Sequence, residues 1–327
     1  MKTPQVICIS RTDSIGDVML TLPLTGFLKQ KIPNVKIIFL GNPYTKPVLR
    51  ACNFIDEVLE WKLIESMTES EQILLFNSKN IDVFIHVFPK KEIARLVKKT
   101  NIKYRIGTSH RSYNLLTCNK LVNFTRKKSE LHEAQLNFKL LKPLGFSQIP
   151  SLSELPLLSG FYPSKKENII VSKESKNIIL HTLSQGSAVE WPMEKFYALA
   201  ENLADKGYHV YFTGTEKEGS IIKKGLPKHK NIYDFTGKMT LSELNSFIVN
   251  CDMLVAASTG PIHIASLGGI NVIGLYSERK PIHPGRWQPI GERVSIITGE
   301  EKASLNGKIT LSISVDEVVS KITELFV

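Results

Sequence analysis

The sequence is poor in the features that mark secreted, metal-stapled and membrane-spanning proteins. Its 327 residues include four cysteines, and no two of them form a CxxC pair. Such scattered cysteines make neither a disulfide framework nor a zinc site, so we expect them to be small buried side chains. No apolar run approaches the roughly 18–20 residues that a membrane-spanning helix needs. The apolar stretch Val6–Ile9 ends at the polar segment Ser10–Asp13, unlike a signal peptide, and we therefore expect a cytoplasmic protein.

The composition is that of a globular protein with two domains. Hydrophobic residues make up 42% of the chain and charged residues 22%, and domains usually hold about 100–200 residues. Short apolar runs alternate with amphipathic stretches from Val6 onward, and the alternation starts again at Ile178 after the polar linker candidate Ser159–Lys176. This rhythm predicts two parallel sheets with helices on both faces. We expect domains over residues 1–160 and 177–312, followed by a final helix within 313–327. One alternative is that this helix packs back on the first domain.

Positive charge is concentrated in one part of the first domain. The net charge is +11, and residues 166–327 hold equal numbers of basic and acidic side chains. Between Phe88 and Lys128 the chain has twelve Lys or Arg residues and a single acidic one, Glu92. Such a field favours anionic partners, namely a phosphorylated glycolipid, an anionic membrane surface or nucleic acid. Few aromatic residues are interleaved, so stacking on nucleic-acid bases is poorly supported, and a solvated basic face is the alternative.

The loop after the first predicted strand ends in a carboxylate with two alternative roles. The loop runs from Arg11 to Asp17, and Gly16 is expected to let the backbone turn tightly before a helix. Asp17 then stands at the helix start, where a carboxylate can act as a general base or as a helix cap. Asp13, on the same loop, is a competing base.

A second junction, Ala257–His263, favours anion binding. A buried strand passes directly into a helix that begins near Gly260, so free backbone N–H groups and the positive end of the helix dipole converge there. Ser258 and Thr259 add hydroxyl groups, and His263 lies one turn into the helix, where it can assist a phosphate. The alternative is an ordinary Ser/Thr cap with a packed histidine.

A third junction, Thr213–Glu218, also follows a predicted strand. The carboxylate of Glu218 could accept hydrogen bonds from the ribose of a nucleotide, and a solvated loop with a helix cap is the alternative. The glycine patterns of dinucleotide-binding oxidoreductases and of P-loop kinases are absent, which argues against both classes.

Eight short motifs follow one another along nearly the whole chain. They are Ser14–Val18 with Thr21-Leu22-Pro23, Tyr104–Gly107, His132-Glu133, Glu190-Trp191-Pro192, Gly214–Glu218, Gly237–Leu241, Ser258–His263 and Leu275-Tyr276. In this order they resemble glycosyltransferase family 9, the lipopolysaccharide heptosyltransferases.

The resemblance implies an α/β protein of the GT-B type, with two doubly wound Rossmann-like domains facing each other across a cleft. It implies inverting transfer, without a metal or other cofactor, of a heptose or related sugar from an ADP-sugar, typically ADP-L-glycero-D-manno-heptose, to a lipopolysaccharide core or similar glycan. Asp17 matches the catalytic base of the family. The donor diphosphate is assigned to Ser184, Ser258, Thr259, Gly260 and His263, the nucleotide to Glu218 and Met239, and the phosphorylated acceptor to Lys98, Arg105 and Lys127 of the basic segment.

Two positions depart from the family pattern, and both concern the donor. Ser258 stands where the family usually has an aspartate that helps to hold the donor sugar, and Val189 stands where it often has a lysine that contacts donor phosphate. The diphosphate would then need another cation, for which Arg279, Lys280 and Arg286 are candidates. A GT-B transferase of a different nucleotide sugar therefore stays open, as do a protein that has lost transfer and a non-catalytic binder of nucleic acid or other anions. For the transferase we expect a nucleotide sugar, a phosphorylated glycan and the anionic inner membrane as partners, and no nucleic acid.

Overall fold

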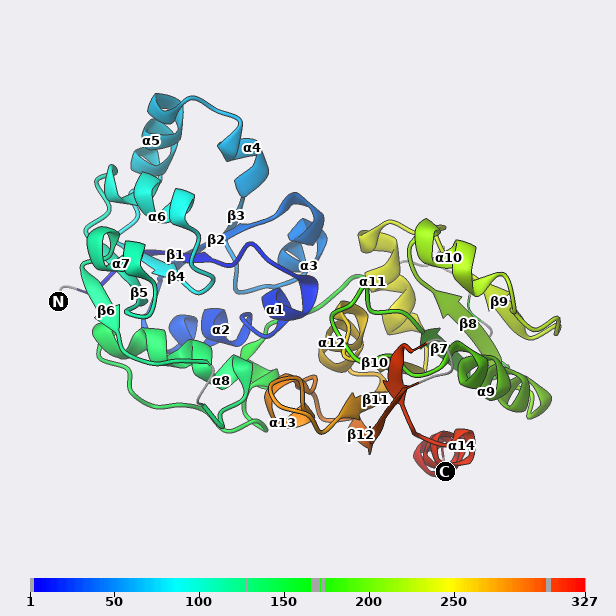
Figure 1. Cartoon of the computed structure of the whole chain (residues 1–327). Helices are drawn as coiled ribbons and strands as arrows, with labels where there is room; N and C mark the ends of the chain where they lie inside the picture. Colours follow the sequence, from blue (N-terminus) through cyan, green and yellow to red (C-terminus); the bar gives the residue numbers. More distant parts are fainter. Residues whose placement is uncertain (1–2, 127–128, 166–170, 172–173, 304–306, 327) are drawn as a thin grey trace. The chain divides into compact units, whose positions relative to one another are not determined.

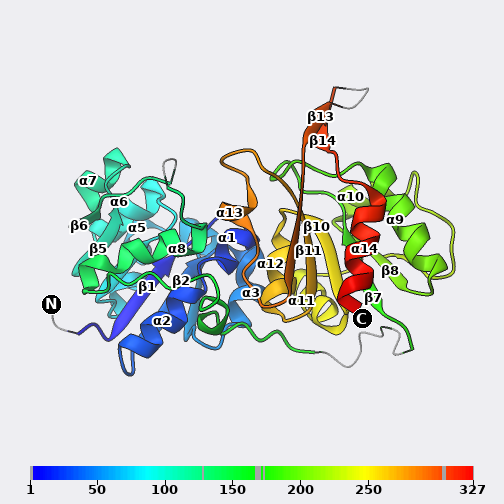
Figure 2. The ribbon, with the colours of Figure 1, turned by 90° about the horizontal axis from the view of Figure 1, so that it is seen from below.

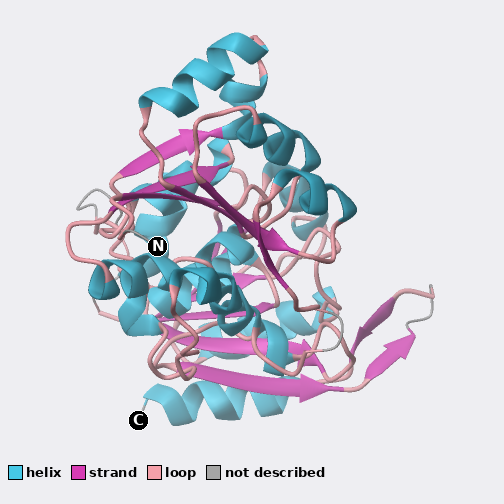
Figure 3. Ribbon diagram, turned by 90° about the vertical axis from the view of Figure 1, so that its left-hand side faces the viewer, coloured by secondary structure: helices cyan, strands magenta, loops and turns pink. Residues whose placement is uncertain are grey.

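The chain folds into two compact units, Met1–Tyr162 and Pro163–Val327 (Figure 1). The structure is a computed structural model, and it describes residues 3–126, 129–165, 171, 174–303 and 307–326. In each unit, helices flank a parallel six-stranded sheet (Figure 3), which confirms the predicted α/β class. The linker predicted over Ser159–Lys176 begins inside the first unit, because Ser159 and Phe161 are buried there and Phe161 forms a β-bridge with Cys52.

The sheet of the first unit is doubly wound. Its strand order is β3-β2-β1-β4-β5-β6, and all neighbouring strands are parallel. The order reverses between β1 and β4, and ligands of doubly wound proteins bind beyond the carboxyl ends of the strands at such a switch point. The strands are β1 (Val6–Ser10), β2 (Lys36–Gly41), β3 (Glu57–Glu60), β4 (Val83–His86), β5 (Tyr104–Thr108) and β6 (Lys120–Val122).

Two helices of the first unit are shorter than the apolar spacing predicts. The spacing predicts one helix over Asp17–Lys29, but the chain forms two helices there, because Pro23 lacks the N–H that a continuing helix needs. The spacing also predicts a helix over His132–Leu144, whose second half, around Pro143, is a 3₁₀ helix. The helices are α1 (Ile15–Met19), α2 (Pro23–Lys31), α3 (Lys46–Arg50), α4 (Trp61–Glu65), α5 (Glu69–Ser78), α6 (Lys91–Lys98), α7 (Ser112–Thr117) and α8 (Glu133–Phe138), with 3₁₀ helices at Pro43–Thr45, Lys139–Leu144 and Pro156–Leu158.

The second unit repeats this topology. Its parallel sheet has the order β12-β11-β10-β7-β8-β9, so its switch point lies between β7 and β10. The strands are β7 (Asn177–His181), β8 (His209–Thr213), β9 (Ile232–Asp234), β10 (Met253–Ala257), β11 (Asn271–Ser277) and β12 (Val294–Gly299), and β13 (Glu301–Ala303) pairs with β14 (Ile309–Leu311) in a separate hairpin. The helices are α9 (Met193–Asp205), α10 (Glu216–Ile222), α11 (Leu241–Asn250), α12 (Gly260–Leu267), α13 (Pro284–Trp287) and α14 (Val315–Phe326).

The C-terminal helix belongs to the core of the second unit. Val318 and Ile322 of α14 are buried there with Leu199 and Leu203 of α9, and α14 lies beside α9 in Figure 2. This contact covers the apolar stripe of α14 within its own unit, and the alternative in which the helix packs back on the first domain stays a prediction.

The remaining composition-based expectations concern cysteines and membrane helices. All four cysteines are free and buried, as predicted. Among the described residues, no helix is long and apolar enough to cross a membrane.

Candidate functional site

The predicted base lies at the switch point of the first sheet. The chain leaves β1 at Ser10, passes through Arg11–Asp13 and enters α1 behind its N-cap residue Ser14, whose hydroxyl accepts the N–H of Asp17. Gly16 lies within α1 and its φ is not positive, so the prediction of a tight turn at Gly16 is wrong. The hydroxyl of Ser14 also donates to Oδ2 of Asp17 at 2.6 Å. The cap of α1 is therefore Ser14 and not the carboxylate of Asp17. The side chain of Asp17 stays 19% exposed, so a substrate can reach it.

A buried arginine holds both candidate bases. The Arg11 side chain is 3% exposed; its Nε donates to Oδ1 of Asp13 at 2.8 Å and its Nη2 to Oδ1 of Asp17. Its Nη1 lies 3.4 Å from Oε1 of Glu133, which Nε of Arg126 contacts at 2.7 Å. Sequence reasoning placed Glu133 only within a family motif, since nothing local pairs it with Arg11.

These contacts and the burial of the loop change the pKa values of Asp13 and Arg11. Burial, together with the charge of Asp17, raises the pKa of Asp13 to about 6, although Arg11 acts in the opposite direction. Burial alone would lower the pKa of Arg11, but the adjoining carboxylates of Asp13, Asp17 and Glu133 raise it above its usual range. Arg11 is therefore a permanent cation, and a carboxyl group beside it titrates near neutral pH.

Buried polar groups without a partner also line this switch point. Within the described parts of the chain, the hydroxyls of Ser10 and Thr12 and both ring nitrogens of His86, the last residue of β4, have no hydrogen-bond partner. Ser10 and His86 are paired across β1 and β4. Burial, with a contribution from Arg105, lowers the pKa of His86 to about 3, so this histidine is neutral at physiological pH.

The second switch point carries the predicted diphosphate site. Thr259 is the N-cap residue of α12, and its hydroxyl makes no capping hydrogen bond. It is buried without a partner among the described residues, as is the hydroxyl of Thr182, which follows β7. His263 lies in the first turn of α12 and is buried. Two hydroxyls and a helix N-terminus at adjacent strand ends can bind an anion.

The loop after β7 holds Ser184 near the start of α12, and its Glu190 is paired with a lysine from the segment before β14. The N–H and hydroxyl of Ser184 donate to Oε1 of Glu190 at 2.7 and 2.9 Å, and the hydroxyl of Ser187 donates to the carbonyl of Ser258 at 3.1 Å. Lys308 donates to Oε2 of Glu190 at 2.6 Å. Sequence reasoning did not single out Lys308, which is 118 residues from its partner.

The predicted nucleotide residues follow β8 and β9. Glu218 is buried, and its Oε2 accepts from the N–H and hydroxyl of Thr215 at 2.6 and 2.9 Å in a capping box of α10. This favours the helix-cap alternative for Glu218, and a ribose contact stays a prediction. Met239 is half-buried in the loop between β9 and α11.

The predicted acceptor residues Lys98 and Arg105 have different surroundings in the structure. Lys98 is exposed on α6, whereas Arg105 donates from Nε to the carbonyl of Thr117 at 2.9 Å and from Nη1 to that of Ile102 at 2.7 Å. These two bonds tie Arg105 to its own unit, which favours a structural role over acceptor binding. Lys127 lies outside the described residues.

The three other cations proposed for the diphosphate, Arg279, Lys280 and Arg286, differ from one another in exposure. Arg279 is exposed and its Nε lies 3.0 Å from Oε1 of Glu301, whereas Arg286 is buried with its guanidinium 5.2 Å from the ring centre of Trp287. Lys280 is exposed and precedes a cis proline.

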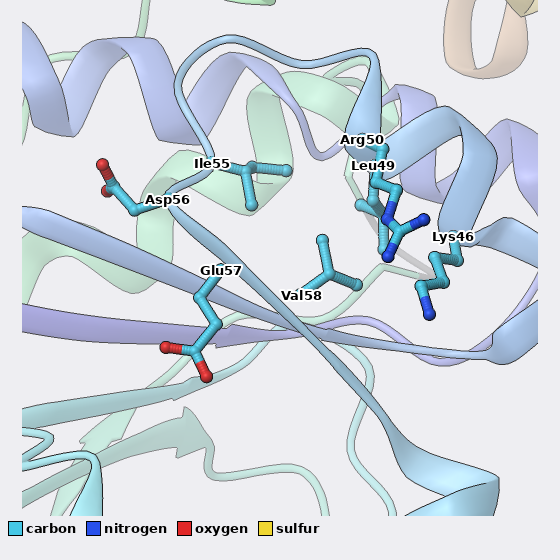
Figure 4. Close-up of a pocket in the computed structure, with 7 residues that line it drawn as sticks. All are labelled: Lys46, Leu49, Arg50, Ile55, Asp56, Glu57 and Val58. Atoms are coloured by element: carbon cyan, nitrogen blue, oxygen red, sulfur yellow. The ribbon is translucent and has the colours of Figure 1, made fainter.

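A shallow pocket in the first unit contains none of the predicted site residues. Lys46, Arg50, Asp56 and Glu57 contribute to its lining (Figure 4). Lys46 is paired with Glu60, and Asp56 and Glu57 with other lysines, so these charges already serve the fold. Among the described residues, no group of three or more His, Cys, Asp or Glu side chains is placed to hold a metal ion.

Comparison with known proteins identifies the family. The profile of glycosyltransferase family 9 (heptosyltransferase) matches residues 76–313. A Haemophilus influenzae protein provisionally named a glycosyltransferase is 26% identical over 331 residues, covering 97% of this chain and 95% of that protein. A family 9 glycosyl transferase from Veillonella parvula has a similar structure, with a TM-score of 0.80, 19% identity and coverage of 99% and 98%. ADP-heptose lipopolysaccharide heptosyltransferase II of Escherichia coli gives a TM-score of 0.74 at 17% identity, covering 98% of each chain. The fold is thus of the GT-B type, and the chain belongs to glycosyltransferase family 9, the heptosyltransferase family.

Proposed function

We propose that this glycosyltransferase moves a heptose from an ADP-sugar to a lipopolysaccharide core, with inversion at the anomeric carbon. The observation that carries the proposal is the carboxylate of Asp17, which Arg11 and Ser14 hold in a fixed orientation while part of it stays open to solvent. A base that is oriented before substrate binds meets the geometric requirement of proton transfer.

The chemistry is a single displacement. Asp17 takes the proton of an acceptor hydroxyl, the acceptor oxygen forms a bond to the anomeric carbon, and the bond from that carbon to the diphosphate breaks. The electron pair leaves with ADP, whose added negative charge is stabilised by the N-terminus of α12, by Thr259 and by His263. One displacement from the face opposite the leaving group inverts the configuration, and no cofactor takes part.

Support for an ADP-heptose donor comes from the family and from the related E. coli enzyme, which is named for that substrate. Lys308, which is paired with Glu190 beside the loop of Ser184, is a further candidate for the cation that the diphosphate needs in the absence of a lysine at position 189. A different nucleotide sugar remains the second candidate, because Ser258 replaces the usual aspartate. Thermal shifts with ADP, UDP, GDP and CMP distinguish the two candidates, since the ADP-heptose proposal predicts stabilisation by ADP alone.

The test of the base is Asp17→Asn, which keeps the size of the side chain but cannot take a proton. With ADP-heptose and heptose-deficient lipopolysaccharide as substrates, we expect ADP release to fall about 10²–10⁴-fold while ADP binding persists. Asp205→Asn, on the solvent-exposed end of α9, is the control. Wild-type turnover in Asp17→Asn would overturn the assignment and direct attention to Asp13. The proposal also predicts that EDTA leaves turnover unchanged and that the product has the inverted anomeric configuration by NMR.

A surface of the first unit supports contact with an anionic membrane. Helix α6 buries Ile93 and Val97 and exposes Lys91, Arg95 and Lys98 on its other side. Helix α7 packs beside it (Figure 1) and exposes Leu115 and Leu116, which are 56% and 74% accessible. We call the exposed side chains of these two helices, with Arg111 at the start of α7, the α6–α7 face.

The α6–α7 face has the chemistry of an interfacial membrane-binding surface. Exposed leucines can enter the boundary between headgroups and acyl chains, and lysines and arginines around them attract anionic lipid. An acceptor that is anchored in a membrane would be met on such a surface. We therefore propose peripheral binding to the cytoplasmic face of the inner membrane through the α6–α7 face.

A further inference from the structure

Glu133 is far from the loop after β1 in the sequence, yet its carboxylate is buried beside that loop. The side chain is 1% exposed, and Oε1 accepts from Arg126 at 2.7 Å as well as facing Arg11 at 3.4 Å. Arg126 is fixed in turn, because its Nη2 donates to the carbonyl of Val87 at 3.1 Å and to Oδ1 of Asn137 at 3.3 Å. A buried carboxylate is costly without such partners, so this placement is strongly specified.

Arg11 connects Glu133 to the candidate bases. Its guanidinium uses a different nitrogen for each of Asp13, Asp17 and Glu133. Because a guanidinium is planar and its donors point in fixed directions, the position of Glu133 restricts the directions in which the two aspartates are held. The ring of Phe88, with its centre 5.9 Å from Cζ of Arg11, packs against the same group.

Among the residues that the structure describes, the paired charges of this cluster are unequal in number. Three of its described carboxylates face two guanidinium groups, which gives one negative charge more than positive when each of these five is ionised. An excess negative charge in a buried place favours uptake of one proton. Glu133 itself is enclosed, whereas Asp13 and Asp17 are 20% and 19% exposed, so the two aspartates are the carboxylates that solvent or an acceptor hydroxyl can reach.

We propose that Glu133, held by Arg126, is a positioning residue for the transfer: acting through Arg11, it orients Asp17 and keeps the Asp13–Asp17 pair basic enough to accept the proton of the acceptor hydroxyl. The inference rests on the proposed role of Asp17 as the base. The O–H bond of the acceptor breaks as its oxygen attacks, the proton passes to the aspartate pair, and it leaves to solvent through the exposed part of the pair.

Three other titratable groups lie on the segments beside the cluster. Tyr44 donates its hydroxyl to the carbonyl of Asp13 at 2.6 Å, and burial raises the pKa of this phenol to about 12. His86 stays neutral, since burial lowers its pKa to about 3. His132, the N-cap residue of α8, uses Nδ1 to accept the N–H of Ala134 at 3.2 Å. His132→Asn, which retains a capping side chain, therefore serves as the control for titration of His132.

The test compares the pH dependence of ADP release, with ADP-heptose and heptose-deficient lipopolysaccharide, in two variants of opposite charge change. Glu133→Gln removes a negative charge, so the acid limb of kcat should move to lower pH by about half to one unit and kcat should fall about 10-fold. Arg126→Gln removes a positive charge, so the acid limb should move to higher pH. Glu133→Asp should restore the wild-type limb, and Glu201→Gln, exposed on α9, should leave the profile unchanged.

A purely structural Glu133 would behave differently. In that case kcat would fall only in proportion to the folded fraction, measured by circular dichroism, and both acid limbs would stay in place, which overturns the inference. Carboxyl ¹³C NMR titration of the unliganded protein gives a second readout, in which the pKa of Asp13 should fall in Glu133→Gln and an unchanged pKa contradicts the inference. If Asp17→Asn abolishes turnover while neither limb moves, the proposed function stands and only the role of Glu133 fails.

Discussion

At the scale of single residues, Asp13 links the site to the stability of the first unit. Its pKa of about 6 is above its ordinary value of 3.8, chiefly because of burial. The folded state therefore holds this proton more tightly than the unfolded state does. The contribution of Asp13 to stability is complete below about pH 4 and is lost as the pH rises through about 6.

Asp13→Asn should remove the loss of stability that accompanies ionisation of Asp13. Relative to wild type, the free energy of unfolding of the variant should rise between about pH 4 and pH 6, by at most about 1.4 kcal/mol per pH unit, and the difference should then be constant. Urea denaturation at a series of pH values measures it. A difference that is equal at pH 4 and pH 7 would show that burial does not raise the pKa of Asp13.

His263 permits a second test at this scale. If its ring contacts the donor diphosphate, His263→Ala should weaken ADP binding by roughly 1–3 kcal/mol, the contribution of a hydrogen bond to a charged group. Isothermal titration calorimetry measures the change. Ser266→Ala is the matched control, since Ser266 is also buried in α12 and its hydroxyl donates to the carbonyl of His263 at 3.1 Å. Equal ADP affinity in His263→Ala and wild type would identify His263 as a core residue.

At the scale of elements, α7 carries two leucines that its own unit leaves exposed. Replacing Leu115 and Leu116 together with serine should lower the fraction of protein bound to vesicles of phosphatidylethanolamine and phosphatidylglycerol about 10-fold, because apolar area no longer leaves water. Co-sedimentation with these vesicles measures the loss, and phosphatidylcholine vesicles should bind little of either protein.

The same substitutions at two other exposed apolar positions provide the control. Leu157→Ser and Ile221→Ser remove similarly exposed side chains from other elements, a 3₁₀ helix of the first unit and α10 of the second, and they should leave vesicle binding unchanged. If all four serine substitutions weaken binding equally, the membrane contact is not localised to α7. Turnover of a water-soluble acceptor should be unaffected throughout, which separates membrane binding from catalysis.

At the scale of the whole molecule, the excess positive charge lies in the part of the chain before residue 166, almost all of it in the first unit. A long-range field is screened over roughly 8 Å at physiological salt, so added salt should raise the KM for the phosphorylated acceptor. The KM for the donor should change little, since residues 166–327 carry no net charge and the predicted anion site uses local N–H groups. Steady-state kinetics against both substrates over a salt series test this.

Replacing Lys91, Arg95 and Lys98 with glutamine should reproduce the effect of high salt, raising the acceptor KM more than it lowers kcat. Lys206, Lys224 and Lys228 are exposed in the second unit, and their triple glutamine variant is the control of equal charge. Equal responses of both KM values, or no response, would make the α6–α7 face a solvated surface with no part in acceptor use.

Local sequence patterns were sufficient for the architecture and for the position of the two switch-point loops. A buried strand, a short polar loop and a helix start are adjacent in the chain, so residue order alone places Asp17 after β1 and Thr259 at the start of α12. The motif order likewise identified the family before the fold was known. Pro23 and Pro143 were also present in the sequence, and the predicted helix lengths were wrong because apolar periodicity was followed across them.

Tertiary structure alone decided the pairings between distant residues. Glu133 meets Arg11 across 122 positions and Lys308 meets Glu190 across 118, and no local pattern distinguishes these residues from solvated charges. The same holds for Arg105, which sequence reasoning assigned to an acceptor and which the fold uses to bind two carbonyl groups. The physical reason is that periodicity and capping act within a few residues, whereas the partner of a charge depends on which side chains the packed sheets and helices bring to one place.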